Sequence, residues 1–575
     1  MIYSIIDKIL YTFVLSTALI LAPYVETDIF RDGDFVLSVP PGFHDEAFDL
    51  VISIPSMPNA TIYWTIDGNI PTPGADRFKE RGDHTIQVSG SIPADGSIAV
   101  SDRSGNWRNS ILTTHSERWS RTVRPAERAE ILQGTAFRFR GFIDGEPVTD
   151  TITATYIVAE NAAERFNNRP MIAITAPYED FLHIYGHANR RDFTLRHRVF
   201  NYEYFELVDN EHIRKFNLPG SSSLGGQGSR GYAQRTINVH LTRGNLNGVV
   251  EHPVFEGLYE LYRFRLWNGG NTFVDDFMRD TFAQAASAEL NVRGGDRNLA
   301  VKFINGEFWG FTRMREHTSN AYFINTRFGI DIDNVAVMDR NTTENRRGRA
   351  DLVADGDEEI VLELYAELAE FLMSHDMSSD YARERLFSEF FCQYNFMDYL
   401  ISNTFFFNID WPQNNVRFFR AIVPDPNSPN PYNDGRWRFL LHDMDGAPAT
   451  HNARPSGNRF SRLYELHSNV HSSELWLNYA FLVFNNPTFA EQFRERGLYV
   501  LDNYFTQEQL ISLHDEFLAQ YTPLLPEMYN RFAIMGTVDD SIDHFDSRAL
   551  QLRRFIENRE YHYRQQLDAL VERVR

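Results

Sequence analysis

The chain has 575 residues, more than one ordinary hydrophobic core accommodates, so we expect two or three domains. Its 56 Lys and Arg residues against 78 Asp and Glu residues give a formal net charge of −22, which argues against nucleic-acid binding and against charge-driven binding to anionic lipid. The single cysteine, Cys392, excludes an intrachain disulfide and a zinc site built from thiolates, and we expect it to be a buried helix residue.

The N-terminal segment contains an apolar run from Ile9 to Val25 behind a single basic residue, Lys8. This length suits the hydrophobic region of a signal peptide, or a membrane anchor slightly short of the usual ~20 residues. We therefore expect residues 1–28 to be a signal peptide or an anchor, and the protein to be secreted or held at the cell surface. Contact with a membrane is expected only through this segment. The sequence leaves its cleavage open.

Residues 34–158 are expected to form a small all-β sandwich. Short runs with alternating apolar residues, such as "DLVISI", "ATIYWTID" and "TAFRFRGFI", are separated by Gly, Pro and Asp. The stretch "TIYWTIDGNIPT" (61–72) runs into an Asp-Gly turn, which predicts a hairpin. It also resembles the strand and "TxDGxxPT" turn of the chitobiase/β-hexosaminidase C-terminal type of accessory module.

That resemblance leaves two roles open for the sandwich. Tyr63 and Trp64 would contact a glycan or the cell surface in one of them. The other role, a structural spacer, is favoured because one of two adjacent aromatic residues on a strand usually points into the core.

From about residue 168 to the C-terminus the pattern becomes a mixture of strands and helices. The Asn305-Gly306 turn predicts a β-hairpin within "LAVKFINGEFWGFTRMREH", and helical periodicity dominates after Asp351. The expected fold class is therefore α+β, with a helical C-terminal part. Further strands are expected in "PMIAITAP", "RHRVFNYEYFEL", "RTINVHLT" and "YRFRLWNGGN", and helices in "TFVDDFMRDTFAQAASAEL" and "YARERLFSEFFCQYNFMDYLISNTFF".

The stretch "NIDWPQNN" (408–415) places a carboxylate and two amides on one loop. Asp410 can accept a proton from a hydroxyl group or hold the hydroxyl by a hydrogen bond. Asn414 or Asn415 can offer an amide oxygen to a hard cation. The Asp-x₄-Asn spacing from Asp410 to Asn415 also occurs on the catalytic loop of protein kinases. The structural alternative is an Asx-turn at Asp410.

A second acidic group ends the predicted strand "WRFLL", where the chain reads "HDMDG". Carboxylates at a strand end, here Asp443 and Asp445, suit Mg²⁺ that is held jointly by protein oxygens and phosphates. The structural alternative is a cap of a helix or turn at Asp445. We expect His442 to line a pocket rather than to bind a metal ion.

Five sequence blocks carry a family resemblance. The two most specific are "NGEFWG", within residues 301–317, and "NIDWPQNN", within residues 395–420. The other three are "GGQGSRGYAQRTINVHL" (225–241), "YRFRLWNGGNTFVDDFMRDTFAQ" (262–284) and "RWRFLLHDMDGA" (436–447). Their order resembles that of the spore-coat H (CotH) family of atypical protein kinases in its longer secreted form, over about residues 168–575.

The resemblance implies a kinase-like fold and a phosphotransferase that uses ATP and Mg²⁺. Its substrates would be Ser or Thr residues of extracytoplasmic or spore-coat proteins. Carried over by position, Asp410 is the catalytic residue that orients the acceptor hydroxyl. Asn415, in preference to Asn414, and Asp443 are metal ligands, with Asp445 beside them or on a second metal ion.

On the nucleotide side, the resemblance implies that Arg230 and Arg235 contact phosphates, with Glu316 as an ion-pair partner. Asn268 begins a turn that serves as a strand-to-helix connection, capped at the next helix, or as a backbone anion site. The family usually has Lys-Lys-Ser where this chain has Arg235 in place of the second lysine. Lys302 could replace that lysine, although we expect it to be a solvated strand residue.

Three alternatives to a protein kinase stay open. The first is a non-catalytic protein of surface or coat assembly, which the change at Arg235 favours. The second is a glycan-associated protein whose function resides in residues 34–158. In the third, AMP or another group is transferred instead of a phosphoryl group.

Overall fold

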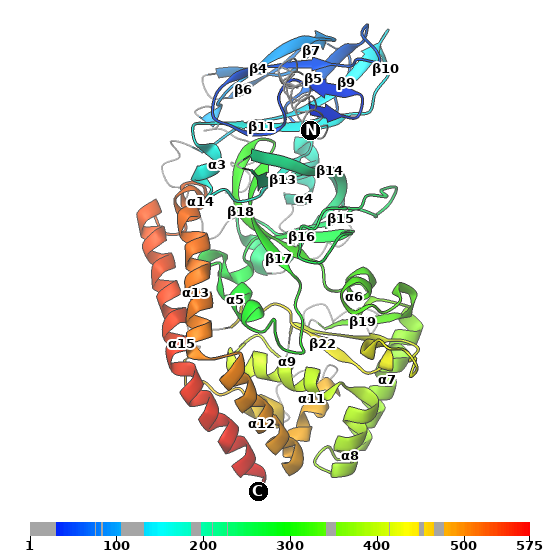
Figure 1. The fold of residues 1–575 in the computed structure, drawn as a ribbon, viewed down its shortest axis with the longest axis vertical. Helices are drawn as coiled ribbons and strands as arrows, with labels where there is room; N and C mark the ends of the chain where they lie inside the picture. Colours follow the sequence, from blue (N-terminus) through cyan, green and yellow to red (C-terminus); the bar gives the residue numbers. More distant parts are fainter. Residues whose placement is uncertain are drawn as a thin grey trace, which may run out of the picture.

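The fold is α+β, in an elongated molecule with strands at the N-terminal end and helices at the C-terminal end (Figure 1). The computed structural model describes residues 30–74, 76–81, 84–104, 131–185, 197–209, 211–226, 228–340, 352–412, 414–447, 454–464 and 476–575. The predicted signal peptide or anchor lies outside this part of the chain. Within it, no helix combines the length and the apolar character needed to cross a membrane.

The N-terminal region consists of two sheets packed around one core. The first has the strand order β1-β2-β4-β8 and the second β3-β11-β9-β5-β7-β6, with β10 on β9. The strands are β1 (Phe30–Asp32), β2 (Phe35–Leu37), β3 (Gly42–His44), β4 (Phe48–Ser53), β5 (Thr61–Thr65), β6 (Arg77–Arg81), β7 (His84–Pro93), β8 (Gly96–Val100), β9 (Thr135–Ile143), β10 (Glu146–Pro147) and β11 (Ile152–Val158).

The structure of this region differs from the sequence-based expectations at the Asp-Gly turn and at the pair Tyr63 and Trp64. The hairpin across the Asp-Gly turn was wrong: β5 pairs with β7 and β9, and β6 pairs with β7. The turn packs against the next region instead, and a Cβ atom on Gly68 would lie 1.9 Å from the carbonyl oxygen of Ala176. Trp64 is buried in the core while Tyr63 packs edge-on against Phe142 on the opposite face, so the two side chains do not form one glycan-binding surface.

The next seven strands form a closed barrel in the order β12-β13-β14-β15-β16-β18-β17. The hairpin of β17 and β18 turns at Asn305 and Gly306, both with positive φ (49° and 80°), as predicted. Among the described residues, four short helical elements, α4, η3, η4 and α5, lie between the barrel strands. These elements are β12 (Met171–Thr175), α4 (Tyr178–Tyr185), β13 (Arg198–Val208), β14 (Glu211–Leu224), the 3₁₀ helix η3 (Gly228–Gly231), β15 (Ile237–His240), β16 (Arg263–Trp267), the 3₁₀ helix η4 (Gly270–Val274), α5 (Arg279–Ala286), β17 (Arg297–Ile304) and β18 (Glu307–Glu316).

A small sheet and a group of helices complete the molecule. The sheet has the order β20-β19-β21-β22, and the helices continue to the C-terminus (Figure 1). The main elements are α3 (Ala162–Arg165), α6 (Ala321–Phe328), β19 (Val335–Arg340), β20 (Val353–Asp355), α7 (Glu358–Ser374), α8 (Asp380–Arg385), α9 (Gln393–Phe405), β21 (Val416–Ala421), β22 (Arg438–Leu440), α10 (Ser461–Tyr464), α11 (Trp476–Phe481), α12 (Pro487–Asn503), α13 (Gln507–Tyr521), α14 (Leu525–Phe532) and α15 (Val538–Val574).

Two predicted helices are shorter than expected. The first begins only at Arg279, with Met278 as its N-cap. The Asp276 carboxylate accepts hydrogen bonds from the backbone N–H groups of Met278 and Arg279, which favours a turn before the helix. The second is divided into α8, a π-helical turn (Leu386–Phe390) and α9. Cys392 lies at this break as the N-cap of α9, and its backbone N–H donates to Trp437. It is half-buried, so its assignment as a buried helix residue was wrong.

The sandwich is joined to the barrel by paired polar groups. Arg214 of β14 forms ion pairs with Asp32 and, at 3.0 Å, with Glu203. Glu203 is fully buried and also accepts a hydrogen bond of 2.5 Å from Thr155 of β11. The backbone N–H of Gly134 donates to the barrel hairpin at 2.8 Å. The sandwich therefore rests directly on the barrel.

Candidate active site

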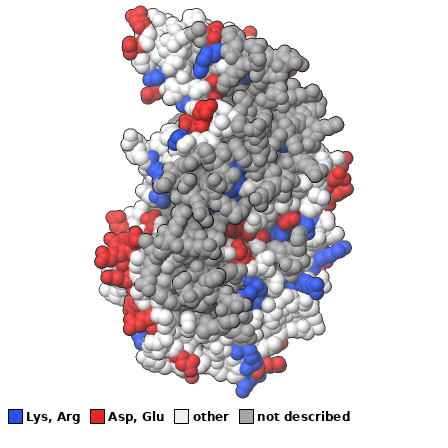
Figure 2. Space-filling model, turned by 180° about the vertical axis from the view of Figure 1, so that it is seen from behind, with Lys and Arg blue, Asp and Glu red and all other residues white. Residues whose placement is uncertain are grey.

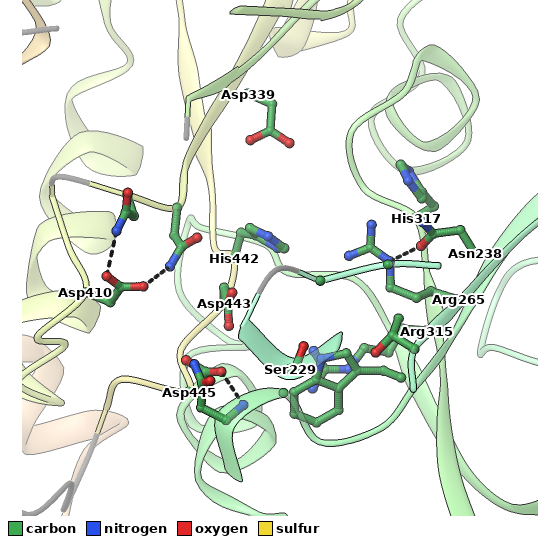
Figure 3. A pocket seen from close by; sticks show the side chains of 18 of the residues that line it. Ser229, Asn238, Arg265, Arg315, His317, Asp339, Asp410, His442, Asp443 and Asp445 are labelled. Atoms are coloured by element: carbon green, nitrogen blue, oxygen red, sulfur yellow. Dashed lines mark hydrogen bonds between the residues drawn. The ribbon is translucent and has the colours of Figure 1, made fainter. Parts of the chain in front are cut away.

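A cavity of ≈ 340 Å³ lies between the barrel and the small sheet. The barrel contributes residues of η3, β15, β16 and β18, and the other wall consists of the loop 408–415, β21 and the segment that follows β22. Figure 3 shows Asp410 on one side of the cavity and Arg265 with His317 on the other, with His442 and Asp443 between them. The cavity thus collects side chains that are distant in sequence.

Asp410 lies half-buried on the loop that links α9 to β21. Its two carboxylate oxygens accept hydrogen bonds from the amide groups of Asn414 (2.7 Å) and Asn415 (3.0 Å). All three side chains line the cavity. Asn415 has a positive φ of 63°. Because it donates to Asp410 through Nδ2, its amide oxygen remains as an acceptor beside Asp410. The loop therefore presents a fixed carboxylate and an amide oxygen together.

Asp443 and Asp445 follow β22 and also line the cavity. Asp445 accepts a hydrogen bond of 2.8 Å from the backbone N–H of Asn271, at the start of η4. Of the two roles left open for this turn, the backbone N–H of Asn271 thus has an anionic partner, and that partner is a carboxylate of the protein itself. Two glycines allow the close approach. A Cβ on Gly270 would lie 2.6 Å from the Asp445 carboxylate, and one on Gly446 would lie 3.2 Å from the Asp410 Cβ.

Burial, together with the charges of neighbouring carboxylates, raises the pKa values of Asp443 and Asp445. Burial and the charges of Asp445, Asp280 and Asp410 raise the pKa of Asp443 well above its ordinary value. Burial, opposed by the Asn271 N–H and aided by Asp280 and Asp410, raises the pKa of Asp445 to about 6. A divalent cation would relieve this repulsion.

The donor set fits Mg²⁺. That ion prefers one or two carboxylates with phosphate and water oxygens over an all-protein cage. Within the described residues, no three carboxylate, imidazole or thiolate groups form a metal cage by themselves. Asp443, Asp445 and the amide oxygen of Asn415 therefore fit a cation that is shared with a phosphate-bearing ligand.

Arginines form the opposite wall of the cavity. Arg265 of β16 and Arg315 of β18 are directly paired across the two strands. Burial and the charges of Arg417 and Arg315 lower the pKa of Arg265 to about 10, so the guanidinium stays protonated. Arg265 donates to the side chain of Asn238 at 2.8 Å, and among the described residues it forms no ion pair with a carboxylate. Like charges in this arrangement favour an anionic ligand.

Arg417 of β21 adds a further arginine to the cavity, from the wall that carries the carboxylates. It forms an ion pair of 2.7 Å with Asp339 and donates to the Nδ1 atom of His442 at 3.0 Å. Burial and the neighbouring Arg417 and Arg265 lower the pKa of His442 well below its ordinary value, so its ring is neutral. His442 also lines the cavity, as expected.

The structure assigns different places to the residues expected on the nucleotide side. Arg230 lines the cavity. Arg235 does not: its guanidinium is buried and donates to the carbonyl oxygens of Tyr185 and, at 3.3 Å, Tyr232. The prediction that Arg235 contacts phosphates is corrected accordingly, because its side chain is used to hold α4 against the barrel.

Two further predictions are corrected. Glu316 forms an ion pair of 2.8 Å with Arg327 and not with an arginine of the cavity. Asn268 is buried behind the cavity, where it accepts from Thr236 at 2.8 Å and donates to the carbonyl oxygen of Gln234. Both residues thus stabilise the barrel rather than contact a ligand.

Lys302, the proposed substitute for the missing lysine, is fully buried on β17 and was wrongly expected to be solvated. Its ammonium nitrogen has no hydrogen-bond partner among the described residues, and burial lowers its pKa to about 7. It does not line the cavity.

Arg265, Arg315 and Arg417 were not among the site residues predicted from the sequence. A signal existed, because "RFRLW" and "RMRE" each carry arginines two residues apart on predicted strands, and two such side chains share one face. The residues meet only through closure of the barrel and pairing of β16 with β18.

A cavity with carboxylates on one wall and arginines on the other is typical of kinase-like phosphotransferases, which position phosphates and neutralise their charge. The chain belongs to the CotH kinase family: the family described as "CotH kinase protein" matches residues 225–563, more than half of the chain. No curated protein matches the chain. The family match begins after the sandwich, so the likeness of residues 34–158 to a chitobiase-type module stays a prediction.

Proposed function

We propose that this protein is a Mg²⁺-dependent protein kinase that transfers the γ-phosphate of ATP to Ser or Thr residues of extracytoplasmic proteins. The observation that carries the proposal is the common cavity of Asp410, Asp443 and Asp445 with three arginines of the opposite wall, Arg230, Arg265 and Arg315. Net charge supports a protein partner rather than a nucleic acid. On the face of the molecule drawn in Figure 2, the Lys and Arg side chains of the described residues lie in small groups among Asp and Glu side chains.

In the proposed reaction, the hydroxyl oxygen of the acceptor attacks the γ-phosphorus. The bond from that phosphorus to the β,γ-bridging oxygen breaks, and its electron pair leaves with ADP. The hydroxyl proton passes to the Asp410 carboxylate, which Asn414 and Asn415 hold in place. Because the transition state is loose, most of the rate enhancement comes from positioning and charge neutralisation.

The other side chains divide the remaining tasks. Asp443, Asp445 and Asn415 would hold Mg²⁺, which when bound neutralises the β- and γ-phosphates. Arg265 and Arg315 would contact phosphate oxygens, and guanidinium groups suit this because they bind two oxygens at once. Arg230 lies on the same side and would close over the phosphates.

The change from lysine to Arg235 gives little support to a non-catalytic protein, because Arg235 does not face the cavity. For the sandwich we propose the role of a spacer that rests on the barrel, since Trp64 is not available to a glycan. Export through the N-terminal apolar run is part of the proposal and follows from the sequence alone.

The test is incorporation of label from γ-labelled ATP in the presence of Mg²⁺, with wild type compared to Asp410→Ala. We expect label in the wild type and almost none in the variant. Asp425→Ala, an exposed carboxylate on the loop before β22, is the matched control and should behave as wild type. Equal incorporation in wild type and Asp410→Ala, or none in either, would contradict the proposal.

A further inference from the structure

Asp280 of helix α5 lies behind the cavity and links its two walls. The side chain is fully buried. One carboxylate oxygen accepts a hydrogen bond of 2.7 Å from the backbone N–H of Met444, the residue between Asp443 and Asp445. The other oxygen forms an ion pair with Arg315, on the opposite wall. A single carboxylate thus contacts both the acidic segment and an arginine of the phosphate side.

The surroundings of Asp280 keep it ionised and immobile. Burial alone would raise its pKa, but Arg315, Arg297 and the Met444 N–H lower the pKa overall. Gln284, one turn later on α5, donates to the same oxygen as Met444 at 3.0 Å. Both oxygens therefore have fixed partners.

Arg315 is held equally firmly. Besides Asp280 it donates to the hydroxyl of Thr281 at 3.2 Å, and its guanidinium lies 3.6 Å from the ring centre of Trp267. Its direction into the cavity thus depends on α5 and on β16. The partners of Asp280 given above, Met444, Gln284 and Arg315, belong to the segment after β22, to α5 and to β18, so the link is local to the site.

We propose that Asp280 is a positioning residue that sets the distance between the metal-binding segment 443–445 and Arg315, so that cation binding and phosphate binding are coupled. This inference rests on the proposed function of the same cavity. Asp280 does not touch the ligand; it acts through the Met444 backbone and through Arg315. Groups that orient metal ligands in this way typically affect metal affinity about 10- to 100-fold when they are replaced.

The test variant is Asp280→Asn. The amide oxygen can still accept from Met444, but the amide N–H₂ group faces the Arg315 guanidinium, so that the ion pair is lost. We expect the affinity for Mn²⁺, measured by electron paramagnetic resonance with a non-hydrolysable ATP analogue present, to fall about 10- to 100-fold. Affinity for the analogue should fall with it, and the two losses should shrink when Arg315→Lys is already present.

Asp276→Asn is the matched control. Asp276 is a buried carboxylate four residues earlier that accepts from two backbone N–H groups (3.0 and 3.2 Å) and pairs with Arg279 at 3.2 Å. It lies on the same segment but contacts no residue of the 443–445 segment through these bonds. We expect a comparable loss of thermal stability and unchanged Mn²⁺ affinity. If Asp280→Asn does not fold, Asp280→Glu keeps the charge and displaces both partners, with the same expected loss.

The outcomes separate the two proposals. Wild-type protein that binds neither Mn²⁺ nor the analogue would overturn the proposed function, and this inference with it. Wild-type binding together with unchanged Mn²⁺ affinity in Asp280→Asn or Asp280→Glu would overturn only the positioning role. Equal losses in Asp280→Asn and Asp276→Asn would do the same, because they would indicate a general effect of stability.

Discussion

The sandwich–barrel joint and the cavity both gather charged side chains away from bulk water, and they differ in how the charges are balanced. At the joint, Arg214 lies between Asp32 and Glu203, and each carboxylate has a cation. In the cavity, Asp443 is crowded by carboxylates and Arg265 is paired with another arginine across two strands. Balanced buried charges hold a structure together, whereas like charges that are kept together call for a ligand of the opposite sign.

Replacing Asp410 should have the largest effect of the changes that test this comparison. Asp410→Asn keeps the shape but removes the proton acceptor, so we expect kcat to fall about 10²–10⁴-fold. Thermal stability should change little, because among the described residues the carboxylate accepts from amide groups and forms no ion pair. Steady-state kinetics and a melting curve measure the two quantities. A large loss of stability with unchanged kcat would contradict this role and would show that Asp410 stabilises the fold, as the ion pairs between the sandwich and the barrel do.

Lys302 tests whether a buried ionisable group that lacks a partner among the described residues must belong to a ligand-binding site. Its pKa is lowered from 10.5 to about 7 by burial, so the folded protein binds fewer protons than the unfolded chain between these pH values. Stability is therefore lost as the pH falls through this window, and the loss is complete below pH 7. Lys302→Met should stabilise the protein at pH 7 by something on the order of 5 kcal/mol, and by much less at pH 10.

Unfolding of Lys302→Met and wild type at both pH values measures this gain, and the activity assay accompanies it. Unchanged activity is expected, because Lys302 does not line the cavity. A variant that is more stable but inactive would show that Lys302 serves the reaction after all.

Arg265 and Arg235 provide a direct contrast between the two kinds of position. Arg265→Ala should weaken binding of an ATP analogue by about 1.5–3 kcal/mol, the worth of a hydrogen bond to a charged group. Arg235→Ala should lower the melting temperature and leave binding of the analogue unchanged. The Arg235 guanidinium donates to the carbonyl oxygen of Tyr185 and does not line the cavity. Calorimetric titration distinguishes them. The reverse pattern would restore the original assignment of Arg235 to the phosphates.

The joint itself is tested at Gly68, where φ is +81° and a Cβ would meet the Ala176 carbonyl oxygen. Gly68→Ala should cost at least about 1–3 kcal/mol through backbone strain. Gly74→Ala, where a Cβ meets nothing within 4 Å, should stay within about 0.5 kcal/mol of wild type. Chemical unfolding compares the two. Equal effects would mean that the sandwich does not rest on the barrel through this turn.

The sequence was informative where chemistry lies on one short segment. Asp410 and Asn415 share a loop, and Asp443 and Asp445 end one strand, so spacing and motif order predicted this wall of the cavity. The arginines of the cavity were not predictable in the same way, because Arg265, Arg315 and Arg417 come from three strands that only the barrel and the small sheet bring together. Arg235 was assigned wrongly because its motif position gave no information on which way the side chain turns.

The same limit applies to the fold. Alternation predicted most barrel strands and the hairpin at Asn305, since the pattern of two residues is local. It could not predict that the turn at Gly68 packs on another region, or that α9 begins only after Cys392, where the backbone binds Trp437. Those outcomes depend on contacts between segments that are distant in sequence.

The most direct test of the central claim is the intact mass of the protein, or of an added acceptor protein, after incubation with ATP and Mg²⁺. We predict a gain of one or more phosphoryl groups with wild type and none with Asp410→Asn. A gain of adenylyl groups would contradict the assignment of the γ-phosphorus as the atom attacked. No mass change with any acceptor, although ATP and Mg²⁺ bind, would contradict the claim that this cavity transfers a phosphoryl group.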